Sequence, residues 1–240
     1  MEEHESLDRA AERQLNDIVI QNPLPRERGN REHIEQVADH IERHLGPIHQ
    51  VFHEIASDIV HIDIHHVKPT PQRDFNILIT TGMSEKAMVT PTEAWECRFA
   101  ELMLFLPPSW PLTMEVMKRE ELYWPVRWMK MLARFPHEHE TWLGWGHTVP
   151  NGDPPEPFAS DTKLCGFLIM GPPIEYEPFF AMKVNPGKTV YFYEMMPLYR
   201  EEMKFKLRHG VDALLDRFAA GRIGHVLDVR RRNVCRGKKR

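Results

Sequence analysis

The chain has 240 residues with a net charge of −4, and 42% of them are hydrophobic, which predicts a folded domain with a sizeable core and excludes a disordered chain. Its apolar runs are too short to cross a bilayer, and its acidic N-terminus lacks the apolar core of a secretory signal, so we expect no membrane contact. Three scattered cysteines form no CxxC pair and no disulfide framework, which favours a reducing, cytoplasmic location.

Two helices are predicted at the start of the chain. The first covers residues 7–20, and the second begins after Asn30, a good N-cap, and ends at Gly46-Pro47. Residues 1–46 are therefore assigned to N-terminal helices that pack on the rest of the domain. In the second helix, the apolar residues recur at helical spacing and share one face; they are Ile34, Val37, Ala38, Ile41 and Leu45.

Beyond Pro47 the apolar residues alternate with a period of two, which is typical of strands. Residues 60–67 and 75–80 are predicted to pair as a hairpin, with 68–74 as its loop. Two further strands are expected at 48–55 and 101–106. In the first strand of the hairpin, polar residues occupy every second position, and we expect them on a half-exposed face; they are His61, Asp63 and His65.

The second half of the chain mixes helices and strands. Because its strands group into hairpins rather than alternate with helices, the sequence predicts an α+β domain over residues 47–229. Its sheet is expected to be mixed, largely antiparallel and covered by helices. The predicted elements are a helix at 123–135, an irregular region at 136–161 with a short strand near 141–148, strands at 163–170, 179–184 and 189–196, and helices at 198–209 and 211–220.

The end of the chain is basic, whereas the rest is acidic. Residues 230–240 hold 7 of the 31 Lys and Arg residues and none of the 35 Asp and Glu residues, so the remainder has 24 basic against 35 acidic residues and a net charge of −11. A terminal run of like charge is usually solvated, and we expect residues 230–240 to form a disordered tail. The acidic body would repel nucleic acid, so nucleic-acid contact is expected only through the tail, Arg230 to Arg240.

Two histidine patterns are candidates for chemistry. His61, Asp63 and His65 on one strand face could bind a metal, although the polar face of a half-buried strand explains the same pattern. His40 and His44 stand one helical turn apart, but the Glu that a zinc hydrolase needs directly after the first His is missing. A metal-assisted hydrolase that uses a His/Asp cluster is therefore the alternative function. Nucleotide-binding glycine loops and GxSxG motifs are missing too, so we expect no cofactor, no catalytic residue and no metal ligand.

The irregular region opens with a segment that is dense in histidine, tryptophan and glutamate. Tryptophan is enriched at interface hot spots, so Trp142, Trp145 and His147 could contact a partner. The same residues could instead seal the core or supply a general acid–base site. Tyr191 and Tyr193 lie on a predicted strand, where aromatic residues usually pack but can also offer a contact surface. These five are the candidate partner-binding residues.

The most distinctive stretch runs from Pro69 to Met88. A loop with two prolines and Arg73 leads into an alternating strand and a tight turn, Thr80-Thr81-Gly82-Met83-Ser84. In these features the chain resembles the suppressor of fused domain family. The likeness spans roughly residues 51–218, and further matching features follow in a consistent order: Ile62-Asp63-Ile64, Glu101-Leu102, Trp124-Pro125, Trp142-Leu143, Gly146-His147-Thr148 and Pro197-Leu198-Tyr199.

The resemblance implies a protein-binding domain without catalytic activity. Animal members of the family bind and restrain a transcription factor, partly by adding a peptide strand to their own sheets. Short, single-domain chains such as this one are similar to the bacterial members, which implies an immunity protein that neutralises a toxin, and the acidic body suits a basic toxin domain. The matching segments then include a structural motif, formed by Asp63, Arg73, Thr81, Gly82, Met83 and Ser84.

Overall fold

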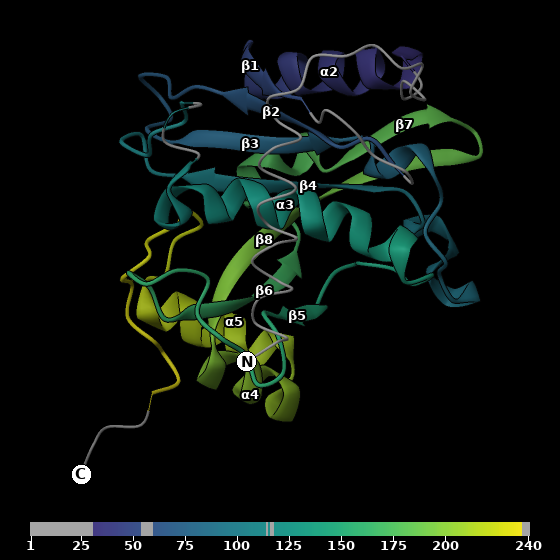
Figure 1. The fold of residues 1–240 in the computed structure, drawn as a ribbon. Helices are drawn as coiled ribbons and strands as arrows, with labels where there is room; N and C mark the ends of the chain where they lie inside the picture. The colour runs from purple at the N-terminus through teal and green to yellow at the C-terminus, as the bar shows by residue number, and fades with distance from the viewer. Residues whose placement is uncertain (1–30, 54–59, 114, 116–117, 237–240) are drawn as a thin grey trace, which may run out of the picture.

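The computed structural model describes residues 31–53, 60–113, 115 and 118–236, and Figure 1 shows their arrangement. The helix expected over residues 7–20 lies outside these ranges. None of the helices within them is long and apolar enough to span a membrane. The described α-helices are α2 (Arg31–Leu45), α3 (Glu120–Glu138), α4 (Arg200–His209) and α5 (Val211–Gly221), and the 3₁₀ helices include η1 (Met83–Glu85), η2 (Thr92–Cys97) and η4 (Ile174–Phe179).

Within the described residues, eight strands form one mixed sheet. Their order is β1-β2-β3-β4-β8-β6-β5, β7 pairs with the start of β8, and only the β4–β8 pairing is parallel. The α+β fold with a mixed, largely antiparallel sheet is confirmed, and β2 and β3 form the predicted hairpin with His65 opposite Ile79. The strands are β1 (Ile48–Phe52), β2 (Asp63–Val67), β3 (Asn76–Thr81), β4 (Ala100–Leu106), β5 (Thr148–Pro150), β6 (Leu164–Met170), β7 (Ala181–Asn185) and β8 (Lys188–Tyr199).

Helices cover both faces of this sheet. On one face, α3 packs through Trp124 and Leu132 on apolar side chains of β2, β3 and β4. On the other face, α2 packs through Val37 and Ile41, together with η4 and β7. A third apolar cluster lies where α4 and α5 meet β6 and the end of β8. Figure 1 shows the result, with α2 at one end of the molecule and the α4–α5 pair at the other.

The half-exposed polar face expected on residues 60–67 is not seen in β2, and of its three polar residues only His61, just before β2, keeps a partly exposed side chain. All five residues of β2 are buried, including Asp63 and His65 at 6% and 4% exposure. The expectation is wrong because β2 lies inside the sheet, between β1 and β3, and is covered from both sides. Hydrogen bonds take the place of water there, such as the one of 3.1 Å between His65 Nε2 and Thr81 Oγ1.

The helix α3 is longer than predicted, since it begins at Glu120 and passes through Pro136 to Glu138. Pro136 removes one amide donor in the last turn, but His139 N–H still bonds to Phe135 C=O and closes the helix. The strand expected near 141–148 is wrong over residues 141–147, because pairing with β6 starts only at Thr148, where β5 begins.

Residues 222–236, here called the C-terminal strap, run back from α5 along the sheet. Leu227 N–H bonds to Phe105 C=O of β4 at 2.9 Å. Further on, the Arg231 guanidinium pairs with the buried carboxylate of Glu202, with 2.7 Å between Nη1 and Oε1. The disordered tail expected from residue 230 therefore does not describe residues 230–236, which the buried ion pair holds against α4. Residues 237–240 lie outside the described ranges, and the domain limits 1–46 and 47–229 stay predictions.

Candidate protein-binding surface

The segment 81–84 is a buried turn built around one carboxylate. Glu101 of β4 is fully buried and accepts hydrogen bonds from Gly82 N–H and Ser84 N–H, at 3.0 Å each, and from Ser84 Oγ at 2.6 Å. Its second oxygen accepts a hydrogen bond from Thr80 Oγ1 at 2.7 Å. Burial raises the pKa of Glu101 to about 7, against the opposing effect of these four donors. The turn thus takes its shape from β4.

Steric limits and hydrogen bonds hold the rest of the motif. Gly82 has a φ of +107°, and a Cβ there would lie 1.8 Å from His61 C=O, so a larger residue does not fit. Met83 is fully buried. Arg73 donates to Leu45 C=O at 2.6 Å and so ties the hairpin loop to the end of α2. These contacts favour the structural role expected of the motif.

Asp63 joins two histidines at the start of β2. Its carboxylate lies 3.0 Å from His53 Nδ1 and 3.1 Å from His61 Nε2. Burial raises the pKa of Asp63, but the hydrogen bonds from the two histidines outweigh this effect and leave the pKa below its usual value. Among the described residues, no three His, Cys, Asp or Glu side chains are placed to hold one metal ion, so no observation supports the metal-assisted hydrolase.

The loop between α3 and β5 presents one tryptophan and packs the other. Trp145 is 50% exposed, whereas Trp142 packs half-buried against the α3 side of the core. The ring of His147 lies 4.3 Å from that of Trp142, and burial lowers the pKa of this histidine. Ile169 C=O of β6 accepts a hydrogen bond from Gly146 N–H at 2.7 Å, and Ile169 N–H donates to His147 C=O at 2.8 Å. The sheet therefore holds the loop in place. The structure therefore brings Trp142 and His147 into contact and leaves Trp145 exposed on the same loop.

The two candidate tyrosines of β8 are covered to different degrees. Tyr193 is only 3% exposed and packs against Phe180, with the ring centroids 5.7 Å apart. Burial raises the pKa of Tyr193 above its usual range. Tyr191 is half-buried and stacks on Tyr193, with 6.3 Å between the ring centroids. A partner could reach Tyr191 in the free chain but not Tyr193, whose contact with a partner stays a prediction.

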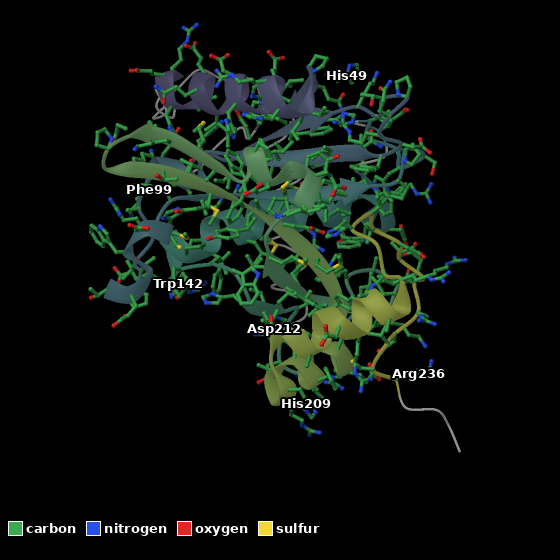
Figure 2. The ribbon with its side chains drawn as sticks, turned by 180° about the vertical axis from the view of Figure 1, so that it is seen from behind. His49, Phe99, Trp142, His209, Asp212 and Arg236 are labelled. Carbon is green, nitrogen blue, oxygen red and sulfur yellow. The ribbon has the colours of Figure 1, made fainter. Side chains whose placement is uncertain are left out.

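A second chain segment places exposed apolar side chains beside the tryptophan loop. Val89 N–H bonds to Thr141 C=O at 3.1 Å, so the two segments lie side by side. Val89 and Trp95 are each 59% exposed. Figure 2 shows Phe99, at the end of this segment, on the same side of the molecule as the loop. We call the combined set the tryptophan surface: Val89, Trp95, Trp142, Trp145 and His147.

Exposed carboxylates stand close to these apolar side chains in the sequence. Two cations are equally near in the sequence. Arg98 stacks on the Trp95 ring at 4.1 Å and donates to Gly187 C=O at 2.6 Å, whereas Lys86, three residues before Val89, is exposed. An apolar surface with acidic residues around it suits a basic partner that carries apolar anchors. The exposed carboxylates lie beside Trp95 in the sequence and just before the loop; they are Glu93, Glu96, Glu138 and Glu140.

Val89, Trp95 and Glu101 are missing from the candidates that the sequence alone suggests. A signal for Trp95 exists, because it stands between two polar, charged stretches and fits no apolar period. The signal for Glu101 is one carboxylate inside an otherwise apolar strand. The exposure of Val89 has no such signal, since it depends on how neighbouring segments pack.

Comparison with known proteins places the chain in a family. The family model described as Suppressor of fused protein (SUFU) matches residues 58–232, well over half of the chain. A search of curated proteins finds no match. Among solved structures, a suppressor of fused homologue from Neisseria gonorrhoeae is 17% identical, with a TM-score of 0.63, and the match covers 85% of this chain and 97% of that one.

Two other solved structures share the fold. The structure of a Sufu–Fu complex is 15% identical, with a TM-score of 0.59 and coverage of 84% of this chain and 92% of that one. Suppressor of fused from Drosophila is 14% identical, with a TM-score of 0.57. The match covers 84% of this chain but only 51% of the Drosophila chain, so this chain spans about half of that protein's length. At these identities the structures show the fold alone, whereas the family model also matches the sequence. The chain belongs to the suppressor of fused family.

Proposed function

We propose that the chain is a protein-binding domain without catalytic activity and that its partner docks on the tryptophan surface. The observation that carries this proposal is the exposure of Val89, Trp95 and Trp145, at 59%, 59% and 50%, on adjoining segments. Apolar side chains that a surface exposes together mark interaction sites, and tryptophan is enriched among residues that dominate binding energy. Family membership supports a binding role, and one of the similar solved structures is a Sufu–Fu complex.

We further propose that the partner is basic and that the chain neutralises a toxin as a bacterial immunity protein. The exposed carboxylates around the tryptophan surface and the acidic charge of the body support a basic partner. One of the similar solved structures is a bacterial homologue, from Neisseria gonorrhoeae, which supports a bacterial chain. Tyr191 would then lie at the margin of the surface, with Tyr193 beneath it.

The test measures the affinity of a captured partner for the wild type and for two variants. The tagged full chain first captures its partner from its own cells, and the partner is identified and purified. We expect Trp145→Ala to weaken binding at least tenfold, or about 1.4 kcal/mol, because it removes an exposed aromatic anchor from the proposed site. Unchanged affinity would remove the tryptophan surface from the interface.

A matched control is available on another face of the molecule. Ile174→Ala removes an apolar side chain that is 84% exposed, more than Trp145. Ile174 begins η4, which packs with α2 on the side of the sheet opposite α3. We expect this variant to bind the partner as the wild type does, so that a loss in Trp145→Ala alone reports on the site.

The toxin proposal needs a separate measurement. The captured partner is expressed alone and together with the chain, and cell growth is compared. We expect growth to stop with the partner alone, to recover with the wild-type chain and to stay arrested with Trp145→Ala. A partner that is harmless when expressed alone would refute the immunity role and leave the binding role intact.

A further inference from the structure

A second region of the chain carries the opposite charge. Residues 200–240 contain 13 of the 31 Lys and Arg residues and 5 of the 35 Asp and Glu residues, which gives a net charge of +8. The rest of the chain has 18 basic and 30 acidic residues, a net charge of −12. The basic region therefore extends well beyond the last eleven residues and includes α4, α5 and the C-terminal strap.

The fold gathers these segments at one end of the molecule. The helices α4 and α5 pack on each other there, and in Figure 2 the labelled residues of both helices and of the strap all lie at this end. The strap is bonded to both helices. Asn233 Nδ2 donates to the Glu201 carboxylate of α4 at 2.8 Å, and Arg217 of α5 donates to Val234 C=O at 3.1 Å. The exposed cations of α4 and of the strap thus lie at the same end of the molecule.

The three consecutive arginines of the strap differ in burial and in their contacts. Arg231 is directed inward, where its guanidinium pairs with Glu202 and lies over the Tyr199 ring at 4.9 Å. Arg230 and Arg232, on either side of it, are exposed. The buried ion pair anchors the strap, and the flanking arginines remain available to an external anion.

A regular row of cations lies on α4. Arg200, Lys204 and Arg208 are all exposed and follow one another at four-residue intervals, so they share one helix face with a rise of about 6 Å per step. A line of separated cations suits a chain of phosphates better than a single small anion. Together with the three exposed arginines nearest the end of the strap, these residues form what we call the basic face: Arg200, Lys204, Arg208, Arg230, Arg232 and Arg236.

We propose that the basic face binds the phosphate backbone of a nucleic acid. All of its cations except Lys204 are arginines, whose planar guanidinium groups match phosphate oxygens. A membrane-binding helix would expose an apolar face. On α4, Met203 is buried, and the strongly exposed large apolar side chain is Leu207, which by itself makes no apolar face. One leucine also falls short of the aromatic anchors that protein interfaces use. The proposal is independent of the tryptophan surface.

The test is the fluorescence anisotropy of a labelled single strand of about 20 nucleotides, as DNA and as RNA, titrated with the full chain at several salt concentrations. The wild type should bind, and the logarithm of its affinity should fall linearly with the logarithm of the salt concentration. Combining Arg200→Gln, Lys204→Gln and Arg208→Gln should lower the affinity at least tenfold. The salt slope should fall by about 0.7 for each phosphate contact that is lost.

A matched control neutralises three exposed cations elsewhere, Arg31→Gln, Arg43→Gln and Lys68→Gln, and should bind as the wild type does. Equal losses in both triple variants, or no binding by the wild type at about 50 mM salt, would overturn the proposal. A chain that ends at Arg236 and has lost all binding would also overturn it, because residues 237–240 would then account for the affinity. So would stronger binding to vesicles with about 30% phosphatidylserine, which would assign the face to membranes.

Discussion

At the scale of single residues, Glu101 organises the segment that most clearly marks the family. Its carboxylate holds Gly82 and Ser84, and Ser84 Oγ lies 2.7 Å from His33 Nε2 of α2. Ser84 Oγ is thus hydrogen-bonded both to Glu101 and to His33. One buried carboxylate therefore connects β3, β4 and α2. The distinctive motif of the sequence thus marks a buried structural contact, and the exposed apolar side chains lie elsewhere.

We expect Glu101→Gln to change how stability depends on pH. Burial raises the pKa of Glu101 from its ordinary value of 4.5 to about 7. Between these pH values the folded chain binds more protons at this group than the unfolded chain does, so the wild type loses stability as pH rises through this window. The variant lacks this contribution. Urea denaturation of both proteins at several pH values measures their free energies of unfolding. As pH rises, the free energy of unfolding of the wild type should fall relative to that of the variant.

The comparison also controls for His33, which titrates nearby. Burial and the charge of Lys188 lower the pKa of His33 to about 4, so its contribution to stability is present above pH 6.5 and is lost as pH falls. Both proteins retain His33, and its titration makes stability rise with pH, the opposite of the trend expected from Glu101. A difference in unfolding free energy that stays constant with pH would show that Glu101 does not titrate in this window.

At the scale of elements, one buried ion pair attaches the C-terminal strap. The Glu202 carboxylate accepts from Arg231 and from the backbone N–H groups of Tyr199 and Val234, at 3.0 and 3.1 Å. The same carboxylate therefore caps α4 and holds the strap against it. This arrangement explains why a basic terminal run, which the sequence pattern assigns to a solvated tail, packs on the domain as far as residue 236.

We expect Arg231→Met to lower the free energy of unfolding by about 3 to 5 kcal/mol, because it leaves a buried carboxylate without its counter-charge. Arg232→Met is the matched control, since it removes the same group from the adjacent, exposed position and should change stability by less than about 0.5 kcal/mol. Urea denaturation of the two variants and the wild type measures both changes in the free energy of unfolding. Similar small losses in both would mean that the strap does not depend on this pair.

At the scale of the whole molecule, the two proposed surfaces should act independently. They share no residue, and one is apolar with acidic neighbours whereas the other is basic. We expect Trp145→Ala to leave nucleic-acid affinity unchanged, and the triple Gln variant of α4 to leave partner affinity unchanged, when both are measured at about 0.1 M salt, where screening acts over about 10 Å. Anisotropy and partner-affinity measurements on the same two proteins check this. A loss of both affinities in either variant would contradict the separation.

Much of the fold could be predicted because its signals are local. Apolar alternation in residues 75–80 marks β3, Gly210 separates α4 from α5, and Gly46 ends α2. The candidate site could be predicted less well from the sequence. Trp142 and Trp145 have the same residue type three positions apart, yet one is packed and the other is 50% exposed. Their different exposure depends on contacts with the core that no local pattern records.

The sequence by itself determined the type and order of the elements, the β2–β3 hairpin and the resemblance to the family, because period, turn residues and short motifs are properties of neighbouring positions. Only the tertiary structure decided that β2 is buried on both faces, that Glu101 holds the turn, and that residues 230–236 pack on α4. Burial and hydrogen bonding depend on which distant segments meet. The surfaces on which the proposed functions depend are therefore properties of the fold, not of any single stretch of the chain.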